Sequence, residues 1–144
     1  MNQLSPAAAQ QQIVATVRRL AQPAVTHPIV VSGDEALCAA LQADGLCAVT
    51  VAACPVGRGQ HTLGIVAGAR SRAALAAAIA GMAPYLAEAA TMVVLIADSC
   101  GGLGPQAGSL LAPFGFRIEA GVRCQRGLLL SAHRDAAAAM AVAA

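Results

Sequence analysis

Residues that could hold a ligand follow the apolar runs of this sequence, where each run turns into a polar or glycine-containing segment. Ser32, Gly33 and Asp34 follow "PIVV", Gly68 follows "HTLGIVA", and Asp98 follows "TMVVLIA". Free N–H groups at a helix start bind anions, glycine lets the backbone approach a ligand, and a carboxylate can act as a general base. These five residues are therefore the candidate cofactor-binding residues, and Asp98 is the best candidate for a general base.

The first of these segments also has a purely structural interpretation. A strand that turns into a helix at "SGDEAL" needs a residue that accepts hydrogen bonds from the free N–H groups of the first helical turn. Ser32 or Asp34 can do this, and the charges of Asp34 and Glu35 suit the positive end of the helix dipole. Capping is the preferred interpretation, because the single glycine, Gly33, allows little close approach to a phosphate.

The segment "DSCGGLGPQAG", residues 98–108, is rich in glycine and follows the most apolar run. Its backbone could bind an anion, and Cys100 could be a nucleophile at a helix start. The segment lacks the Lys-Ser/Thr ending of a nucleoside-triphosphate loop, and no histidine stands beside Cys100. A flexible loop is the preferred interpretation. The sequence brings no nucleophile, base and orienting group together, so no catalytic residue is assigned.

The composition argues against several classes of function. The chain has 144 residues, the size of one domain, with 58% apolar residues, 2% aromatic residues and a formal charge of +2. The basic residues are all arginines scattered along the chain, and aromatic residues are few, so we expect no nucleic-acid binding. His27, His61 and His133 show no metal-ligand spacing, so we expect no metal site.

The cysteines and the hydropathy bear on where the protein resides. The number of cysteines, five, is odd and there is no CxxC, which indicates a reduced, cytoplasmic environment. Cys38 and Cys47 lie in apolar runs and are expected to be buried thiols. The start "MNQLSPAAAQQQ" lacks the features of a secretory signal. Although the mean hydropathy is +0.66, the longest apolar tract, 73–97, contains Pro84 and Glu88 near its middle. The tract therefore predicts a helix followed by a buried strand, and no membrane span.

The spacing of apolar residues predicts helices that alternate with strands. Helices are predicted over 6–21, 34–44 and 72–89, and a short helix is predicted through Leu110, Leu111 and Phe114. Pro84 predicts a kink or an early end in the helix over 72–89. Strands are predicted over 28–33, 46–53, 61–68, 91–99, 116–124 and 126–134. Such alternation is typical of a mostly parallel sheet with helices on both faces. The last two strands have no helix between them and must be antiparallel.

Two long segments resemble the C-terminal half of class I S-adenosylmethionine-dependent methyltransferases. "HTLGIVAGARSRAALAAAIAGMAPYLAEAATMVVLIADS" is similar to the family's fourth strand, following helix and fifth strand, and "LLAPFGFRIEAGVRCQRGLLLSAHR" to its last helix, a Gly-Phe pair (Gly115, Phe116) and its final β-hairpin. The resemblance covers residues 25–134. It implies an α/β fold: a three-layer Rossmann-like sandwich with a mostly parallel sheet of about six strands that ends in an antiparallel β-hairpin. The chain is then a single domain over 1–144, with an N-terminal helix (1–24), a sheet core (25–134) and an Ala-rich tail (135–144).

The sequence departs from this family at three places where members hold the cofactor. The Gly-rich loop after the first strand keeps only Gly33, the second strand ends "VAACP" without the acid that holds the ribose, and the helix and strand that wall the adenine are absent. Only residues 54–60 separate the second and third strands, and a parallel crossover normally takes about a dozen residues. Either this segment crosses in extended form, or the strand order differs from the family's.

The resemblance and the departures together leave two functions open. The preferred one is a reduced methyltransferase-like protein without catalysis or cofactor that serves as a structural, regulatory or partner-binding subunit. The alternative is an active small S-adenosylmethionine-dependent methyltransferase, or a nucleotide-binding enzyme, with a non-standard pocket. A carboxyl edge of the sheet that is closed by apolar side chains would favour the first, and an open cleft beside Gly33 and Gly68 the second. The many apolar and few charged residues also predict a homo-oligomer or a protein partner.

Overall fold

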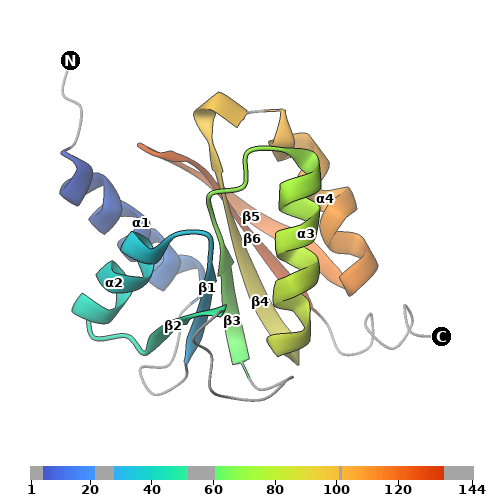
Figure 1. The fold of residues 1–144 in the computed structure, drawn as a ribbon, viewed down its shortest axis with the longest axis horizontal. Helices are drawn as coiled ribbons and strands as arrows, with labels where there is room; N and C mark the ends of the chain where they lie inside the picture. Colours follow the sequence, from blue (N-terminus) through green and yellow to red (C-terminus); the bar gives the residue numbers. More distant parts are fainter. Residues whose placement is uncertain (1–4, 22–27, 52–60, 101, 135–144) are drawn as a thin grey trace.

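Helices cover both faces of a six-stranded sheet in the residues that the computed structural model describes, which are 5–21, 28–51, 61–100 and 102–134 (Figure 1). In chain order the elements are α1 (Pro6–Ala21), β1 (Ile29–Ser32), α2 (Glu35–Ala43), β2 (Ala48–Thr50), β3 (His61–Val66), α3 (Arg72–Met82), η2 (Ala83–Tyr85), β4 (Leu86–Ala97), η3 (Asp98–Cys100), α4 (Leu103–Leu111), η4 (Ala112–Phe114), β5 (Phe116–Cys124) and β6 (Gly127–Arg134).

The strands lie in the order β2-β1-β3-β4-β6-β5. The first four are parallel to one another, whereas β6 is antiparallel to both β4 and β5. This confirms the predicted mostly parallel sheet that ends in an antiparallel hairpin. Because β2 and β3 pair with opposite sides of β1, the chain between Thr50 and His61 passes from one side of β1 to the other. Its path at residues 52–60, which include Cys54, lies outside the described residues.

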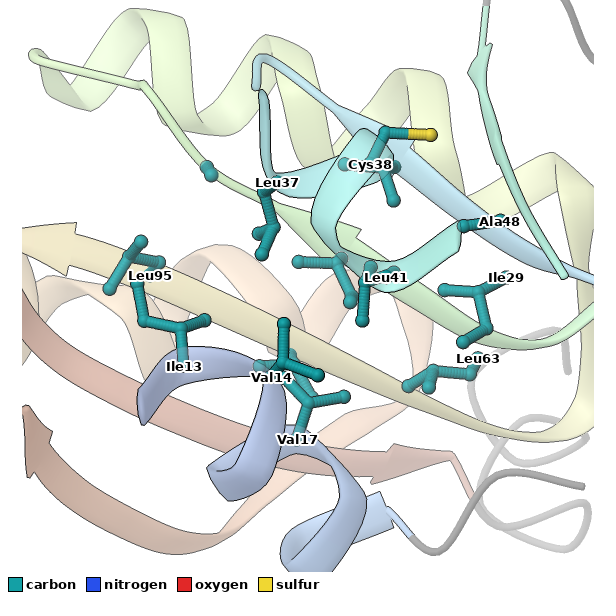
Figure 2. Close-up of a cluster of buried hydrophobic side chains, with 14 of the residues drawn as sticks. Ile13, Val14, Val17, Ile29, Leu37, Cys38, Leu41, Ala48, Leu63 and Leu95 are labelled. Atoms are coloured by element: carbon teal, nitrogen blue, oxygen red, sulfur yellow. The ribbon is translucent and has the colours of Figure 1, made fainter. Parts of the chain in front are cut away.

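One face of the sheet is covered by α1 and α2. Ile13, Val14 and Val17 of α1 and Leu37 and Leu41 of α2 are each at most 1% exposed. Figure 2 shows these side chains converging over the sheet, as the helical spacing in the sequence predicts. Burying such a side chain stabilises a protein by about 1.5–3 kcal/mol, so this layer is a large part of the core.

The other face of the sheet is covered by α3 and α4. The buried residues of α3 recur at Leu75, Ile79 and Met82, and those of α4 at Leu103, Ala107 and Leu111, which is the spacing of one helix face. Both sets belong to a second apolar cluster against the sheet. With α1 and α2 opposite, the molecule has the predicted three layers, α/β/α (Figure 1).

The boundary between α3 and β4 differs from the predicted one. The helix ends at Met82 instead of 89, and the strand begins at Leu86 instead of 91. Pro84 stands in η2 directly after the helix, so the early end at this proline is the alternative that is confirmed. The predicted strands over 46–53 and 61–68 are shorter at their described ends, since Leu46 donates its N–H to Leu41 at the end of α2.

The predicted flexible loop over 98–108 is wrong, because α4 begins within it at Leu103. Pro105 is tolerated in the first helical turn, where its missing N–H would have no partner in the helix. The buried stripe of α4 supplies the packing that holds this glycine-containing segment in a helix. The prediction that Cys47 is buried is also wrong: Cys38 is buried on α2, but Cys47, between α2 and β2, is exposed.

No described helix combines the length and the apolar character that a membrane span requires. The predicted Ala-rich tail, residues 135–144, and His27 lie outside the described residues.

Candidate functional site

The carboxyl ends of the parallel strands bring several chain segments together at one edge of the sheet, toward the top of Figure 1 for β1, β3 and β4. The turns after these strands carry Ser32, Gly33, Asp34, Gly68 and Asp98, which the sequence singled out. Because β6 runs antiparallel to β4, the β5–β6 turn lies at this edge too. The first half of α1 reaches the same place.

Asp34 is held by two different partners at this edge. Its Oδ1 accepts a 2.9 Å hydrogen bond from the N–H of Leu37, and its Oδ2 lies 3.0 Å from Nη2 of Arg126, in the β5–β6 turn. The Asp34 side chain is 12% exposed and that of Arg126 38%. The predicted capping role of Asp34 is therefore confirmed, and the ion pair with Arg126 is an additional role.

Arg126 also binds α1. Its Nη1 donates to Oε1 of Gln10, and the N–H of Gln125 donates to Oε1 of Gln12 over 2.7 Å. The Nε2 atom of Gln10 is buried and has no hydrogen-bond partner among the described residues. Sequence reasoning missed Arg126, because no local pattern distinguishes it from the other arginines; its position depends on the pairing of Gly127 with Ala97.

Gly33 and Gly68 face each other, backbone against backbone. A Cβ on Gly33 would lie 1.9 Å from the carbonyl oxygen of Ala67, and one on Gly68 would lie 2.6 Å from that of Gly33. Both glycines have a positive φ, of +86° and +79°. The N–H of Ala67 donates a 2.9 Å hydrogen bond to the carbonyl oxygen of Ser32, and this bond joins the same two turns. These glycines let the β1 and β3 turns touch, and the space between the turns is thereby filled.

Three cavities that described residues border lie around the Asp34–Arg126 pair. The β1–β2 cavity has a volume of ≈ 500 Å³ and is bordered by Val31, Ser32, Gly33, Asp34, Glu35, Thr50 and Val51. The α1–α2 cavity, of ≈ 560 Å³, is bordered by Ala7, Ala9, Gln10, Asp34, Ala36 and Arg126. The β3–β4 cavity, of ≈ 90 Å³, is bordered by Gly68, Ala69, Arg70, Leu95, Ala97 and Arg126. Asp34 therefore borders two cavities, and Arg126 also borders two.

The first two cavities have the size of small-molecule sites, which is about 300–1,000 Å³. In the β1–β2 cavity the hydroxyls of Ser32 and Thr50 and the carboxylate of Glu35 are hydrogen-bonding groups among valine side chains. This cavity is an opening beside Gly33, whereas the space beside Gly68 is small.

Asp98 and Cys100 do not share these cavities. The carboxylate of Asp98 forms a 2.9 Å ion pair with Arg123, and the two side chains are 62% and 71% exposed. The Cys100 thiol points at the carbonyl oxygen of Arg70, 3.6 Å away. Neither residue borders any of the three cavities, so the structure places Asp98 at this edge of the sheet but outside the cavities that Ser32, Gly33 and Asp34 border. The described residues contain no group of histidines, cysteines and acids that could hold a metal ion.

Among the described residues, two groups outside the cavities have shifted pKa values. Burial, and to a smaller extent the charge of Glu35, raises the pKa of the Cys38 thiol, which keeps it protonated and unreactive near neutral pH. At the opposite edge of the sheet, burial lowers the pKa of Arg134, while Glu88 acts in the other direction. The Nη2 atom of Arg134 donates to the carbonyl oxygens of Leu86 and Ala87, 2.6 Å away in each case, and fixes the start of β4.

The sequence matches no protein-family model and is similar to no curated protein. Solved structures are similar to it in fold. The 1,6-didemethyltoxoflavin-N1-methyltransferase of Burkholderia thailandensis has a TM-score of 0.66 at 12% identity, over 90% of this chain and 79% of the enzyme. The N-methyltransferase NodS of Bradyrhizobium japonicum has a TM-score of 0.59 at 15% identity, over 92% and 99% of the two chains.

A protein-(glutamine-N5) methyltransferase of Alicyclobacillus acidocaldarius has a TM-score of 0.56 at 15% identity, over 94% of this chain and 99% of the other. All three likenesses extend over most of both chains at low sequence identity. The chain therefore has the Rossmann-like fold of the class I S-adenosylmethionine-dependent methyltransferases.

Proposed function

We propose that this protein is a small S-adenosylmethionine-dependent methyltransferase that holds the adenosine part of its cofactor in the β1–β2 cavity. The observation that supports this most is the cavity itself: ≈ 500 Å³ at the carboxyl ends of β1 and β2, with two acidic and two hydroxyl-bearing residues at its border. In α/β proteins, ligands bind at this edge of the sheet. Among proteins of the same fold, the Burkholderia enzyme and NodS have been solved with S-adenosylhomocysteine.

The residues that border the cavity fit an adenosine, although they differ from the family's pattern. The family's acid at the end of the second strand is missing, but Glu35 brings a carboxylate to the same cavity from the first turn of α2. A carboxylate accepts hydrogen bonds from ribose hydroxyls, and the hydroxyls of Ser32 and Thr50 can donate or accept. Val31 and Val51 supply apolar surface for the base. Glu35 is the residue we assign to the ribose.

S-adenosylmethionine supplies an activated methyl group, so the protein's main task is to bring an acceptor beside the cofactor and to exclude water. The Asp34–Arg126 pair suits the first task. Asp34 is fixed by its bond to α2, and it borders both the β1–β2 cavity and the α1–α2 cavity. A cofactor in the first cavity and an acceptor in the second would meet at this residue. The acceptor's own nucleophilicity then carries the reaction, because the described residues present no general base in these cavities apart from Asp34 and Glu35.

Calorimetric titration of the purified chain with S-adenosylhomocysteine tests the proposal. We expect saturable binding that Glu35→Gln weakens about tenfold or more, since a hydrogen bond to a charged group contributes about 1.5–3 kcal/mol. Glu119→Gln is the matched control: it makes the same change on an exposed residue of β5 that borders none of the cavities, and it should bind like the wild type. A titration without binding at millimolar ligand would overturn the proposal.

The absence of binding would favour a protein that uses the same fold as a non-catalytic subunit. That function is supported by the filled space between the β1 and β3 turns and by the single glycine after β1. Sedimentation would then be the next measurement, because the predicted homo-oligomer or protein partner becomes the main route to a function.

A further inference from the structure

Two of the residues that border the β3–β4 cavity are arginines. Arg70 comes from the turn after β3 and Arg126 from the β5–β6 turn, and the remaining border is formed by small and apolar residues such as Gly68 and Leu95. The cavity measures ≈ 90 Å³, which suits one small charged group and not a whole ligand. Two arginines that border so small a space are a suitable donor set for a carboxylate or a phosphate.

The charges around this cavity leave an excess of positive charge. The guanidinium of Arg70 makes no hydrogen bond or ion pair within the described residues. Arg126 uses Nη2 for Asp34 and Nη1 for Gln10, and an arginine has five N–H donors in all. Asp34 thus balances one of the two positive charges. Asp98, the acid directly after the carboxyl end of β4, is already paired with Arg123.

Arg126 borders both this small cavity and the larger α1–α2 cavity. The alanines Ala7, Ala9 and Ala36 make much of that border apolar. Gln10 lies there too, and its Nε2 is a buried donor without a partner among the described residues. A ligand with an apolar body and an anionic group at one end would place the body in the α1–α2 cavity and the charge between Arg70 and Arg126.

We propose that the methyl acceptor is a small, mainly apolar carboxylate that carries a hydroxyl or an amine on its body; the carboxylate group binds between Arg70 and Arg126, and the body occupies the α1–α2 cavity. The hydroxyl oxygen or amine nitrogen would form the new bond to the methyl carbon as the bond between that carbon and the sulfonium sulfur breaks, and S-adenosylhomocysteine would leave with the electron pair. The Asp34 carboxylate, which borders both the β1–β2 cavity and the α1–α2 cavity, would take the proton. That this ligand accepts a methyl group rests on the function proposed above, whereas the anion site rests on the arginines and the cavities alone. Glu35 and Asp34 border the β1–β2 cavity, Asp34 also borders the α1–α2 cavity, and the two arginines border the β3–β4 cavity. The edge would thus hold a cationic cofactor and an anionic acceptor in neighbouring places.

Titration with benzoate, followed by ¹H–¹⁵N NMR, tests the anion site, and benzamide is the neutral probe of the same shape. We expect benzoate to shift the amide signals around Gly68, Arg70 and Arg126 in a saturable way, and benzamide to bind at least about tenfold more weakly. The opposite order of affinity, or equal shifts with both probes, would overturn the proposal.

Three variants locate the anion. Arg70→Gln and Arg126→Gln should each weaken benzoate binding about tenfold, since each removes one charged donor at a partly exposed site. Arg123→Gln removes the same charge from the same edge of the sheet, but this residue borders none of the cavities, so its affinity should stay within about twofold of the wild type. Arg70→Gln disturbs no described side-chain interaction and keeps the test informative if Arg126→Gln is unstable. Equal losses in all three variants would indicate general charge attraction and refute the site.

Repeating the benzoate titration on protein saturated with S-adenosylhomocysteine distinguishes two sources of the carboxylate. Unchanged or tighter benzoate binding supports an acceptor site. Displacement of benzoate would mean that the arginines hold the cofactor's own amino-acid carboxylate, and would overturn the acceptor proposal. If benzoate binds and S-adenosylhomocysteine does not, the anion site is supported and the methyltransferase function is refuted. If only S-adenosylhomocysteine binds, the methyltransferase function is supported and the anion site is refuted.

Discussion

Replacing Gly33 with alanine separates the structural use of this glycine from any use in binding. In a cofactor site, a glycine at this position leaves room for a ligand. In this structure the room is already taken, because a Cβ on Gly33 would lie 1.9 Å from the carbonyl oxygen of Ala67. We therefore expect Gly33→Ala to destabilise the protein in the absence of any ligand.

Two effects determine the size of this destabilisation. The φ of Gly33 is +86°, and a left-handed backbone costs a residue with a Cβ about 1–2 kcal/mol. The contact with a backbone oxygen also forces the β1 and β3 turns apart and breaks the 2.9 Å bond from Ala67 to Ser32, which contributes about 1 kcal/mol. The free energy of unfolding should fall by about 3 kcal/mol, a large part of the roughly 5–15 kcal/mol of a typical domain.

Urea unfolding followed by far-UV circular dichroism measures this change, and the chain provides a matched control. Gly45 has a φ of +90°, but a Cβ there would meet nothing within 4 Å. Gly45→Ala therefore reports the backbone cost alone, about 1 kcal/mol after the loss of unfolded-state entropy is included. Gly68→Ala, at 2.6 Å from the carbonyl oxygen of Gly33, should resemble Gly33→Ala. If Gly33→Ala and Gly45→Ala were equally destabilised, the contact between the turns would have no energetic weight and the reasoning would be refuted.

Other properties of the chain can be tested in the same way. Asp34→Ala removes the cap of α2 and the partner of Arg126, and it should lower the free energy of unfolding measured in urea by about 1–2 kcal/mol. Asp34→Asn keeps the cap, so its free energy of unfolding should fall by less. Equal losses in the two variants would argue against the capping role. Leu111→Ala should cost about 2–5 kcal/mol in the same assay, because Leu111 is fully buried in the α3–α4 layer, and a loss below 1 kcal/mol would contradict that packing. Iodoacetamide labelling of the native protein, read by mass spectrometry, should modify Cys47 before Cys38, whose thiol is buried and has a raised pKa; the reverse order would contradict the burial. The pKa of Cys38 in the folded protein is raised above its ordinary value of 9.0, so the stability that comes from the neutral thiol is fully present below pH 9.0. This stability is lost as the pH rises toward the folded-state pKa. The urea midpoint should therefore decline less above pH 9.0 in Cys38→Ala than in the wild type.

The helices, the strands and the layers of this fold could be predicted from local patterns. The helical spacing of Ile13, Val14 and Val17 gives α1, and Asp34 marks the start of α2 as a cap. The errors arose where two tendencies compete over a few residues. Residues 86–90 can extend either a helix or a strand, and Pro84 together with pairing to β3 decides for the strand. Residues 103–108 are rich in glycine, and the burial of Leu103 and Ala107 decides for a helix.

The candidate site was predictable only in part. The sequence located the turn of Ser32, Gly33 and Asp34, because a strand followed by a capped helix is a local feature. It grouped Asp98 with them, and the structure places Asp98 in an exposed pair with Arg123. The predicted domain limits and the predicted oligomer remain predictions.

By itself, the sequence determined which segments become helices and strands and that the sheet is mostly parallel with a closing hairpin. Those properties follow from the spacing of apolar residues and from the lengths of the connections, which act over a few residues. The tertiary structure decided that β2 and β3 lie on opposite sides of β1 in the sheet. It also decided that Gly33 touches Gly68 and that Arg126 reaches Asp34 from 92 residues away. These contacts exist because β6 returns antiparallel beside β4 and delivers its turn to the carboxyl edge, and no local pattern carries information about such a return.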